Sequence, residues 1–163
     1  MIVPFQIERG MLRRYPEGAA RNRLDQLGIL APVATAGEDA VFRFSQAVTA
    51  RDAESAVALC HPDVVFRSVI GISGHAYLGH DGVRKYFEDV DQAWQEWSVD
   101  VERVAEASDG RVVIVMMMHA RGRHSGALLE VQTAHIWTLS DGQLLWNEPF
   151  RDGAEALRAA GLV

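Results

Sequence analysis

The sequence has little of what several protein classes depend on. It contains one cysteine, Cys60, so no disulfide can form within the chain. No apolar run approaches the roughly 20 residues of a membrane-spanning helix. Basic residues are outnumbered, with 16 Lys and Arg against 22 Asp and Glu, whereas nucleic-acid binding draws on clustered positive charge. These absences argue against a disulfide scaffold, a membrane protein and a nucleic-acid-binding protein.

What is present is the composition of a globular domain. The chain has 163 residues, of which 48% are apolar and 23% charged, enough for one domain with a substantial core. The first residues lack the apolar core and the small-residue cleavage site of a secretory signal, so we expect a cytoplasmic protein.

The charge is distributed unevenly along the chain. Residues 1–37 carry five arginines against three acids, whereas residues 38–163 carry 11 basic against 19 acidic residues. The first segment also lacks a sustained apolar period and contains several Gly and Pro breaks. We therefore predict a weakly structured N-terminal extension over residues 1–37, with one short helix near Ala19–Leu27, and a folded domain over residues 38–163.

Apolar periodicity predicts helices first and strands afterwards in the domain. Helices are expected from Glu38, over Ala53–Cys60, over Asp81–Trp97 and over Ala154–Ala160. A first strand is expected at Val64–Phe66, and Asp-Gly or Ser-Gly pairs separate four later strands as hairpin turns. These strands are Val99–Ala105, Arg111–Arg123, Leu128–Leu139 and Gln143–Phe150. This order of elements is that of an α+β fold.

The same order, with the segments ARDAESAVALCHPDVVF, YLGHDGVRKYF, HIWTLSDGQL and AEALRAAGL, resembles the nuclear transport factor 2-like superfamily. It is most similar to the SnoaL-like, polyketide cyclase-type group. The resemblance implies a cone-shaped, curved antiparallel sheet wrapped around the N-terminal helices, with an internal pocket. Members include ketosteroid isomerases, epoxide hydrolases, dehydratases, polyketide cyclases and binding modules without activity, so the fold leaves the function open.

The turns predict which side chains share a face of the sheet. If Ser125-Gly126 and Asp141-Gly142 are two-residue loops, Arg121 faces Glu130, His119 faces Gln132 and Trp137 faces Trp146. One face is then polar, with Met117, His119, Arg121, Glu130, Gln132, Ala134, Ile136, Asn147 and Arg151. The other is apolar, with Met116, Met118, Val131, His135, Trp137, Trp146 and Phe150.

Amphipathicity alone would bury the apolar face, whereas the resemblance implies that the polar face lines the pocket. Both conditions hold if the apolar face is convex and buried against a second subunit. We therefore predict a homodimer through the convex face around Trp137 and Trp146.

This orientation makes His119 and Glu130 the candidate catalytic acid/base groups, because a histidine titrates near neutral pH and a carboxyl pKa responds to its surroundings. An alternative without catalysis remains open for each residue. His119 can be a hairpin residue at the solvent-exposed edge of the sheet, and Glu130 can form an ion pair with Arg121. His135 is interpreted as a structural partner of Glu148. The candidate ligand-binding residues are Phe44, Phe87, Trp94, Met117, Arg121, Gln132 and Asn147. No metal-ligand spacing and no nucleotide fingerprint is present, so we expect neither a metal nor a cofactor.

The chain departs from the characterised members of the superfamily at their catalytic positions. The oxyanion-hole tyrosine, general-base aspartate and protonated aspartate of ketosteroid isomerases fall at Phe44, near Ser68 and at Ala134. The last-strand aspartate of limonene-epoxide-hydrolase-like enzymes falls near Pro149, and their Arg/Asp pair falls among Val115, Met117 and His119. The pocket aspartate of the polyketide cyclases has no counterpart.

Two hypotheses for function follow. The first is a cofactor-free acid/base enzyme of the isomerase, dehydratase or cyclase type, acting on a small, mostly apolar molecule. The alternative is a ligand-binding or dimerisation module of the same fold without catalytic activity. The absence of the usual catalytic residues favours this alternative.

Overall fold

A computed structural model describes residues 5–8, 11–14, 34–69 and 75–163 of the protein. The first two of these segments are the antiparallel strands β1 (Phe5–Glu8) and β2 (Met11–Arg14), which form a two-stranded sheet of their own. The helix predicted near Ala19–Leu27 lies outside the described residues.

The first helix of the domain, α2 (Ala36–Ala50), begins with a capping box. The Thr35 hydroxyl accepts a hydrogen bond from the Glu38 amide at 3.1 Å, and the Glu38 carboxylate accepts one from the Thr35 amide at 3.0 Å. These bonds satisfy amides that a helix start leaves without partners. The other Glu38 oxygen accepts the Glu106 amide at 3.0 Å, which ties the helix start to the main sheet.

Two further helices follow before the long strands. The short α3 (Ala53–Ala58) is capped by Asp52, whose carboxylate accepts the Ser55 amide at 3.0 Å. Helix α4 (Gly79–Ala93) presents an apolar stripe that includes Val83, Phe87 and Val90. It ends four residues earlier than predicted, because the chain changes directly from helix to strand at Trp94.

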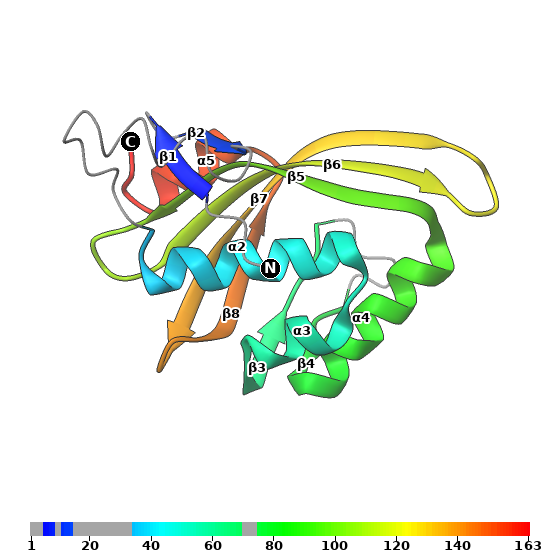
Figure 1. Ribbon diagram of the computed structural model, residues 1–163, viewed down its shortest axis with the longest axis horizontal. Helices are drawn as coiled ribbons and strands as arrows, with labels where there is room; N and C mark the ends of the chain where they lie inside the picture. The colour runs from blue at the N-terminus through cyan, green and yellow to red at the C-terminus, as the bar shows by residue number, and fades with distance from the viewer. Residues whose placement is uncertain (1–4, 9–10, 15–33, 70–74) are drawn as a thin grey trace.

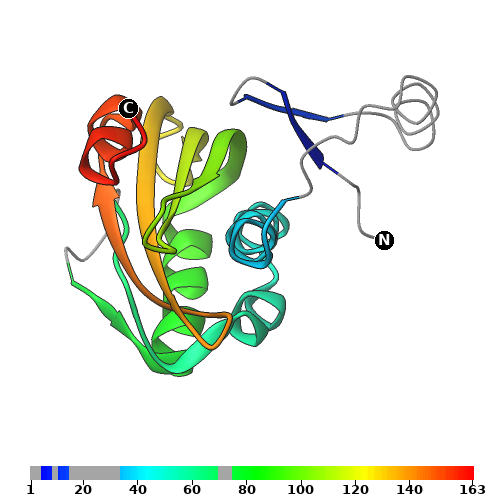
Figure 2. The same ribbon diagram turned by 90° about the vertical axis from the view of Figure 1, so that its left-hand side faces the viewer.

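The main sheet has six strands in the order β4-β3-β8-β7-β6-β5. Its strands are β3 (Cys60–Phe66), β4 (Tyr77–Leu78), β5 (Trp94–Glu106), β6 (Val112–Gly122), β7 (Leu128–Ser140) and β8 (Gln143–Phe150). Neighbouring strands are antiparallel except β3 and β8, which run parallel, so the sheet is mixed and not purely antiparallel. The sheet is curved, with α2 and α4 on its concave side and α5 (Gly153–Ala159) on its outer side (Figures 1 and 2). The predicted α+β class is confirmed.

The last hairpin has the predicted turn but a different register. Ser140 pairs with Gln143 across the Asp141-Gly142 loop, as expected. One additional residue of β8 then bulges at Leu145, because Thr138 pairs with Trp146 while Leu139 pairs with Leu144. A bulge moves every later side chain to the opposite face. The predicted pairs Trp137–Trp146 and His135–Glu148 are therefore wrong.

The preceding hairpin differs in a way that preserves the faces. Its loop has four residues instead of two, because the Gly122 amide donates to the Ala127 carbonyl at 2.9 Å. His119 consequently pairs with Glu130, and Arg121 with Leu128. The shift is by two positions, so each side chain keeps its predicted face.

The predicted orientation of the sheet is wrong. Trp137 and Met118, on the apolar face, are buried under the helices, and Trp137 is only 1% exposed. His119, on the polar face, lies on the outer side with a 39% exposed side chain. Amphipathicity decides the orientation, because α2 and α4 supply an apolar surface that covers the apolar strand face.

Part of the outer face is also covered by the protein itself. Helix α5 packs on it through a second apolar cluster, which contains Val113, Val115, Ala134, Ile136, Ala156, Leu157 and Ala160. The helix start lies so close to the sheet that a β-carbon at Gly153 would be 2.6 Å from a Val115 methyl carbon. The Gly153 amide also donates to the Gln132 side chain at 3.3 Å.

We predict that residues 1–33 are dispensable for folding of the domain, because β1 and β2 form a sheet of their own and share no strand pairing with the main sheet, although β2 lies beside β5. Deleting these residues is expected to leave the thermal unfolding midpoint nearly unchanged. Deleting residues 1–37 also removes the Thr35 cap, which is expected to cost about 1 kcal/mol, or about 2–4 °C. Calorimetry of both deletion variants measures the unfolding midpoints. A midpoint several degrees lower after deletion of residues 1–33 would contradict the prediction.

Candidate functional site

A partly enclosed cavity of about 50 Å³ lies between the inner face of the sheet and the helices α2 and α4. That volume is several times what one water molecule needs. Its walls are mainly apolar and aromatic, and include Phe44, Phe66, Met116, Met118 and Trp137. Among the described lining residues none is Asp, Glu, Lys or Arg.

Five lining side chains carry a hydroxyl or an imidazole: Ser45, Ser68, Tyr86, Thr133 and His135. Trp97 also lines the cavity, and its buried indole N–H has no hydrogen-bond partner among the described residues. The Ser45 hydroxyl donates to the Phe42 carbonyl at 2.6 Å, inside its own helix. The Tyr86 hydroxyl is hydrogen-bonded to Ser68, and burial raises the pKa of Tyr86, so the phenol stays neutral. All polar groups that face the cavity are therefore uncharged at neutral pH, provided that His135 is neutral.

His135 is held by a hydrogen bond from β8. The Asn147 side-chain nitrogen lies 2.8 Å from His135 Nδ1, and both residues are buried. Burial lowers the pKa of His135 to about 4, because the charged imidazolium loses its hydration. The ring is therefore neutral at physiological pH. The β8 bulge creates this contact, since it brings Asn147 to the inner face, where the regular register would have placed Trp146.

The structure places the predicted catalytic pair outside the cavity. The ring nitrogens of His119 lie 3.2 Å from the Asp100 carboxylate and 3.3 Å from the Glu130 carboxylate, across three neighbouring strands. Glu130 is 71% exposed. An acid/base role for these two residues stays a prediction; both line a separate, more open hollow of about 490 Å³ at the edge of the sheet.

The predicted ligand-binding residues are divided between three locations. Phe44 lines the cavity, and Asn147 lies behind it through its bond to His135. Phe87 is a core residue of α4, and Trp94 packs on Trp97 with ring centroids 5.7 Å apart. The remaining three lie on the outer face: Met117, Arg121 and Gln132.

Two of these outer residues have partners within the protein. Arg121 pairs with Glu96 at 3.2 Å, so the alternative pair with Glu130 is not formed. Gln132 donates to Glu102 at 2.7 Å and accepts the amide that starts α5. Sequence reasoning missed several cavity residues, above all His135. The alternation of apolar and polar residues along β6 and β7 could have identified them, because it marks the apolar face as the buried one.

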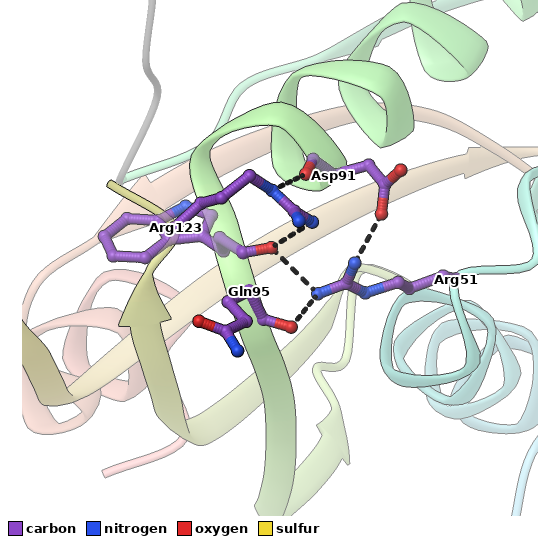
Figure 3. Close-up of polar contacts among 5 residues, drawn as sticks. Arg51, Asp91, Gln95 and Arg123 are labelled. Carbon is purple, nitrogen blue, oxygen red and sulfur yellow. Dashed lines mark hydrogen bonds and ion pairs between the residues drawn. The ribbon is translucent and has the colours of Figure 1, made fainter. Parts of the chain in front are cut away.

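Two arginines hold the beginning of β5, a strand that forms part of the cavity wall (Figure 3). Arg51 pairs with the Asp91 carboxylate and donates to the carbonyls of Trp94 and Gln95 at 3.1 and 3.2 Å. Arg123, from the β6–β7 turn, donates to the carbonyls of Asp91 and Trp94 at 3.0 and 3.3 Å. Positive groups at the carboxyl end of a helix satisfy its free carbonyls and its dipole.

The sequence profile of the SnoaL-like domain matches residues 41–146, which is more than half of the chain and includes both sides of the cavity. The chain belongs to the SnoaL-like domain family. No curated protein sequence matches it at a significant level. None of the described helices has the length and apolarity to cross a membrane.

Solved structures similar to this SnoaL-like chain share its fold at low sequence identity. An NTF2-like protein of unknown function from Burkholderia pseudomallei has a TM-score of 0.65 and 22% identity, over 78% of this chain and 98% of its own. A putative polyketide cyclase from Xanthomonas campestris has a TM-score of 0.63 and 14% identity, over 76% and 95%. A Mycobacterium tuberculosis protein in complex with estradiol-17β-hemisuccinate has a TM-score of 0.61 and 20% identity, over 73% and 95%.

The depressed pKa of His135 predicts a pH-dependent stability for this SnoaL-like protein. Between pH 6.5 and about 4 the unfolded state binds a proton at this residue that the folded state excludes. The free energy of unfolding therefore falls as the pH falls, by roughly 2 kcal/mol between about pH 7.5 and pH 5 for this residue alone. His135→Gln is expected to remove that part of the slope, whereas His124→Gln, in an exposed turn, is expected to retain it. Denaturant unfolding across this pH range measures both, and equal slopes in the two variants would contradict the assignment.

Proposed function

We propose that this SnoaL-like protein binds a small, mostly apolar molecule in the cavity between α2, α4 and the sheet, with His135 as its principal polar contact. The observation that carries the proposal is the composition of the cavity wall. Its described residues are aromatic, aliphatic or uncharged polar, and its single imidazole is fixed by a buried partner. Apolar walls with a few oriented polar groups are the usual composition of a small-molecule site.

Similar structures support the same proposal. The Mycobacterium tuberculosis protein of this fold was crystallised with estradiol-17β-hemisuccinate, a ligand with a large apolar body. The family match extends over the segments that enclose the cavity, from α2 to β8. The likeness concerns the fold, so the ligand of this chain follows from its own lining residues.

Catalysis without a cofactor is the second candidate function. Imidazole is the side chain used most often for proton transfer, and His135 is the one imidazole among the described lining residues. Isomerisation, dehydration and cyclisation next to a carbonyl need a donor for the developing oxyanion and a base. The described lining contains no carboxylate that could serve as the base, so binding is the function that the site supports best.

Two neighbouring methionines test which face of the sheet binds the ligand. Met116 lines the cavity, whereas Met117 lies on the outer face of the same strand. Met116→Trp is expected to fill the cavity and to reduce the affinity for a bound ketone such as α-tetralone by about 10-fold or more. Met117→Trp is expected to leave the affinity unchanged. Titration calorimetry on both variants, after a check of folding by circular dichroism, measures the difference, and the opposite result would restore the outer face as the binding site.

A homodimer through the outer face of the sheet stays a prediction, but Trp137, one of the two tryptophans expected in the contact, is not on that face. Trp137 is inside the protein and α5 covers part of the face, which leaves Trp146, 39% exposed, as the exposed tryptophan. If the outer face associates, light scattering at tens of micromolar is expected to give a dimer mass, and Trp146→Glu to give a monomer. A monomer in the unaltered protein would remove this prediction.

A further inference from the structure

We infer that the cavity selects uncharged molecules that carry a carbonyl-type oxygen, and that His135 binds this oxygen through Nε2–H as a fixed hydrogen-bond donor. This inference rests on the proposed binding function and deepens it by naming the ligand class. It also assigns His135 the role of donor to the ligand, as distinct from a base.

The first step is the orientation of the Asn147 amide, which two backbone groups determine. The Arg67 amide lies 2.7 Å from Asn147 Oδ1, and the Arg67 carbonyl lies 2.7 Å from Asn147 Nδ2. A backbone N–H can only donate and a backbone carbonyl can only accept. The amide therefore cannot be reversed without breaking both bonds, and Nδ2 is the atom that faces His135.

The second step is the tautomer of His135. Asn147 Nδ2 is a donor only, and its second hydrogen is directed at His135 Nδ1 across 2.8 Å. Nδ1 must therefore be the unprotonated, accepting nitrogen, and in a neutral ring the hydrogen resides on Nε2. The two nitrogens lie on opposite sides of the ring, so Nε2–H is directed away from Asn147. Within the part of the chain that the structure describes, the bond to Asn147 is the one hydrogen bond found for the His135 ring.

The third step is the charge of the ligand. His135 is 7% exposed and lies in a cavity whose described walls contain no charged side chain. A carboxylate or ammonium ligand would lose its hydration there without a counter-ion, which costs several kcal/mol. An uncharged oxygen acceptor both tolerates the apolar walls and satisfies Nε2–H. The stacked rings of Phe66 and Trp137, whose planes are 9° apart, form part of the apolar wall.

Three related probes test the ligand class. α-Tetralone is an uncharged aromatic ketone, tetralin is the same ring system without the oxygen, and 1-naphthoate is a carboxylate of similar size. We expect the ketone to bind about 10-fold more tightly than the hydrocarbon, as one buried hydrogen bond implies, and the carboxylate not to bind measurably. His135→Phe is expected to abolish the difference between ketone and hydrocarbon, whereas His124→Phe is expected to retain it.

Nitrogen-15 spectroscopy of the unaltered protein tests the tautomer without any ligand. The His135 ring is expected to show a protonated Nε2 and an unprotonated Nδ1 at neutral pH, and added α-tetralone is expected to shift the Nε2 resonance. A protonated Nδ1, or equal affinity for ketone and hydrocarbon, would overturn the inference while leaving the binding function intact. Absence of binding by all three probes, with the Nε2 tautomer present, would instead count against the proposed function.

Discussion

The packing of Trp137 against Phe66 and Phe44 determines which side of the sheet becomes the interior. Trp137 lies nearly parallel to Phe66, with ring centroids 5.8 Å apart, and meets Phe44 edge-on at 5.2 Å. These three rings come from β7, β3 and α2, so their contact joins the sheet to its covering helix. Each large aromatic side chain contributes a substantial apolar area. Once these rings are buried together, alternation along each strand assigns every neighbouring side chain to a face.

The β8 bulge is the second constraint on the site. Without it, Trp146 would face the interior and Asn147 the outside, and His135 would have no amide beside it. The bulge reverses these positions, and the buried amide then spans the Arg67 backbone and the His135 ring. A fully satisfied buried amide of this kind holds its neighbours in one arrangement. The same local irregularity thereby completes the core and sets the hydrogen-bonding character of the cavity.

The outer face of the sheet shows how one chain can cover its own apolar surface. Val113, Val115, Ala134 and Ile136 are all on the outer side, yet α5 buries them. Gly153 permits this close approach, because a larger residue would collide with Val115. Beyond α5 the outer face becomes polar, with His119 between Asp100 and Glu130. Charged side chains of this kind are common where a strand faces water.

The sequence by itself determined the α+β class, the resemblance to SnoaL-like proteins, the position of the hairpins and the division of β6 and β7 into two faces. These features depend on local periodicity and turn chemistry, which are present in the chain before it folds. Only the tertiary structure decided which face is inside, because that depends on the aromatic surface that α2 and β3 bring to Trp137. It also decided the partner of His135. The bulge at Leu145 depends on packing across the sheet, because the residues next to Leu145 carry no turn signal. The hydrogen bond between Asn147 and His135 was therefore out of reach of the sequence. The outer-face positions of His119 and Glu130 follow from the strand alternation once the apolar face is buried.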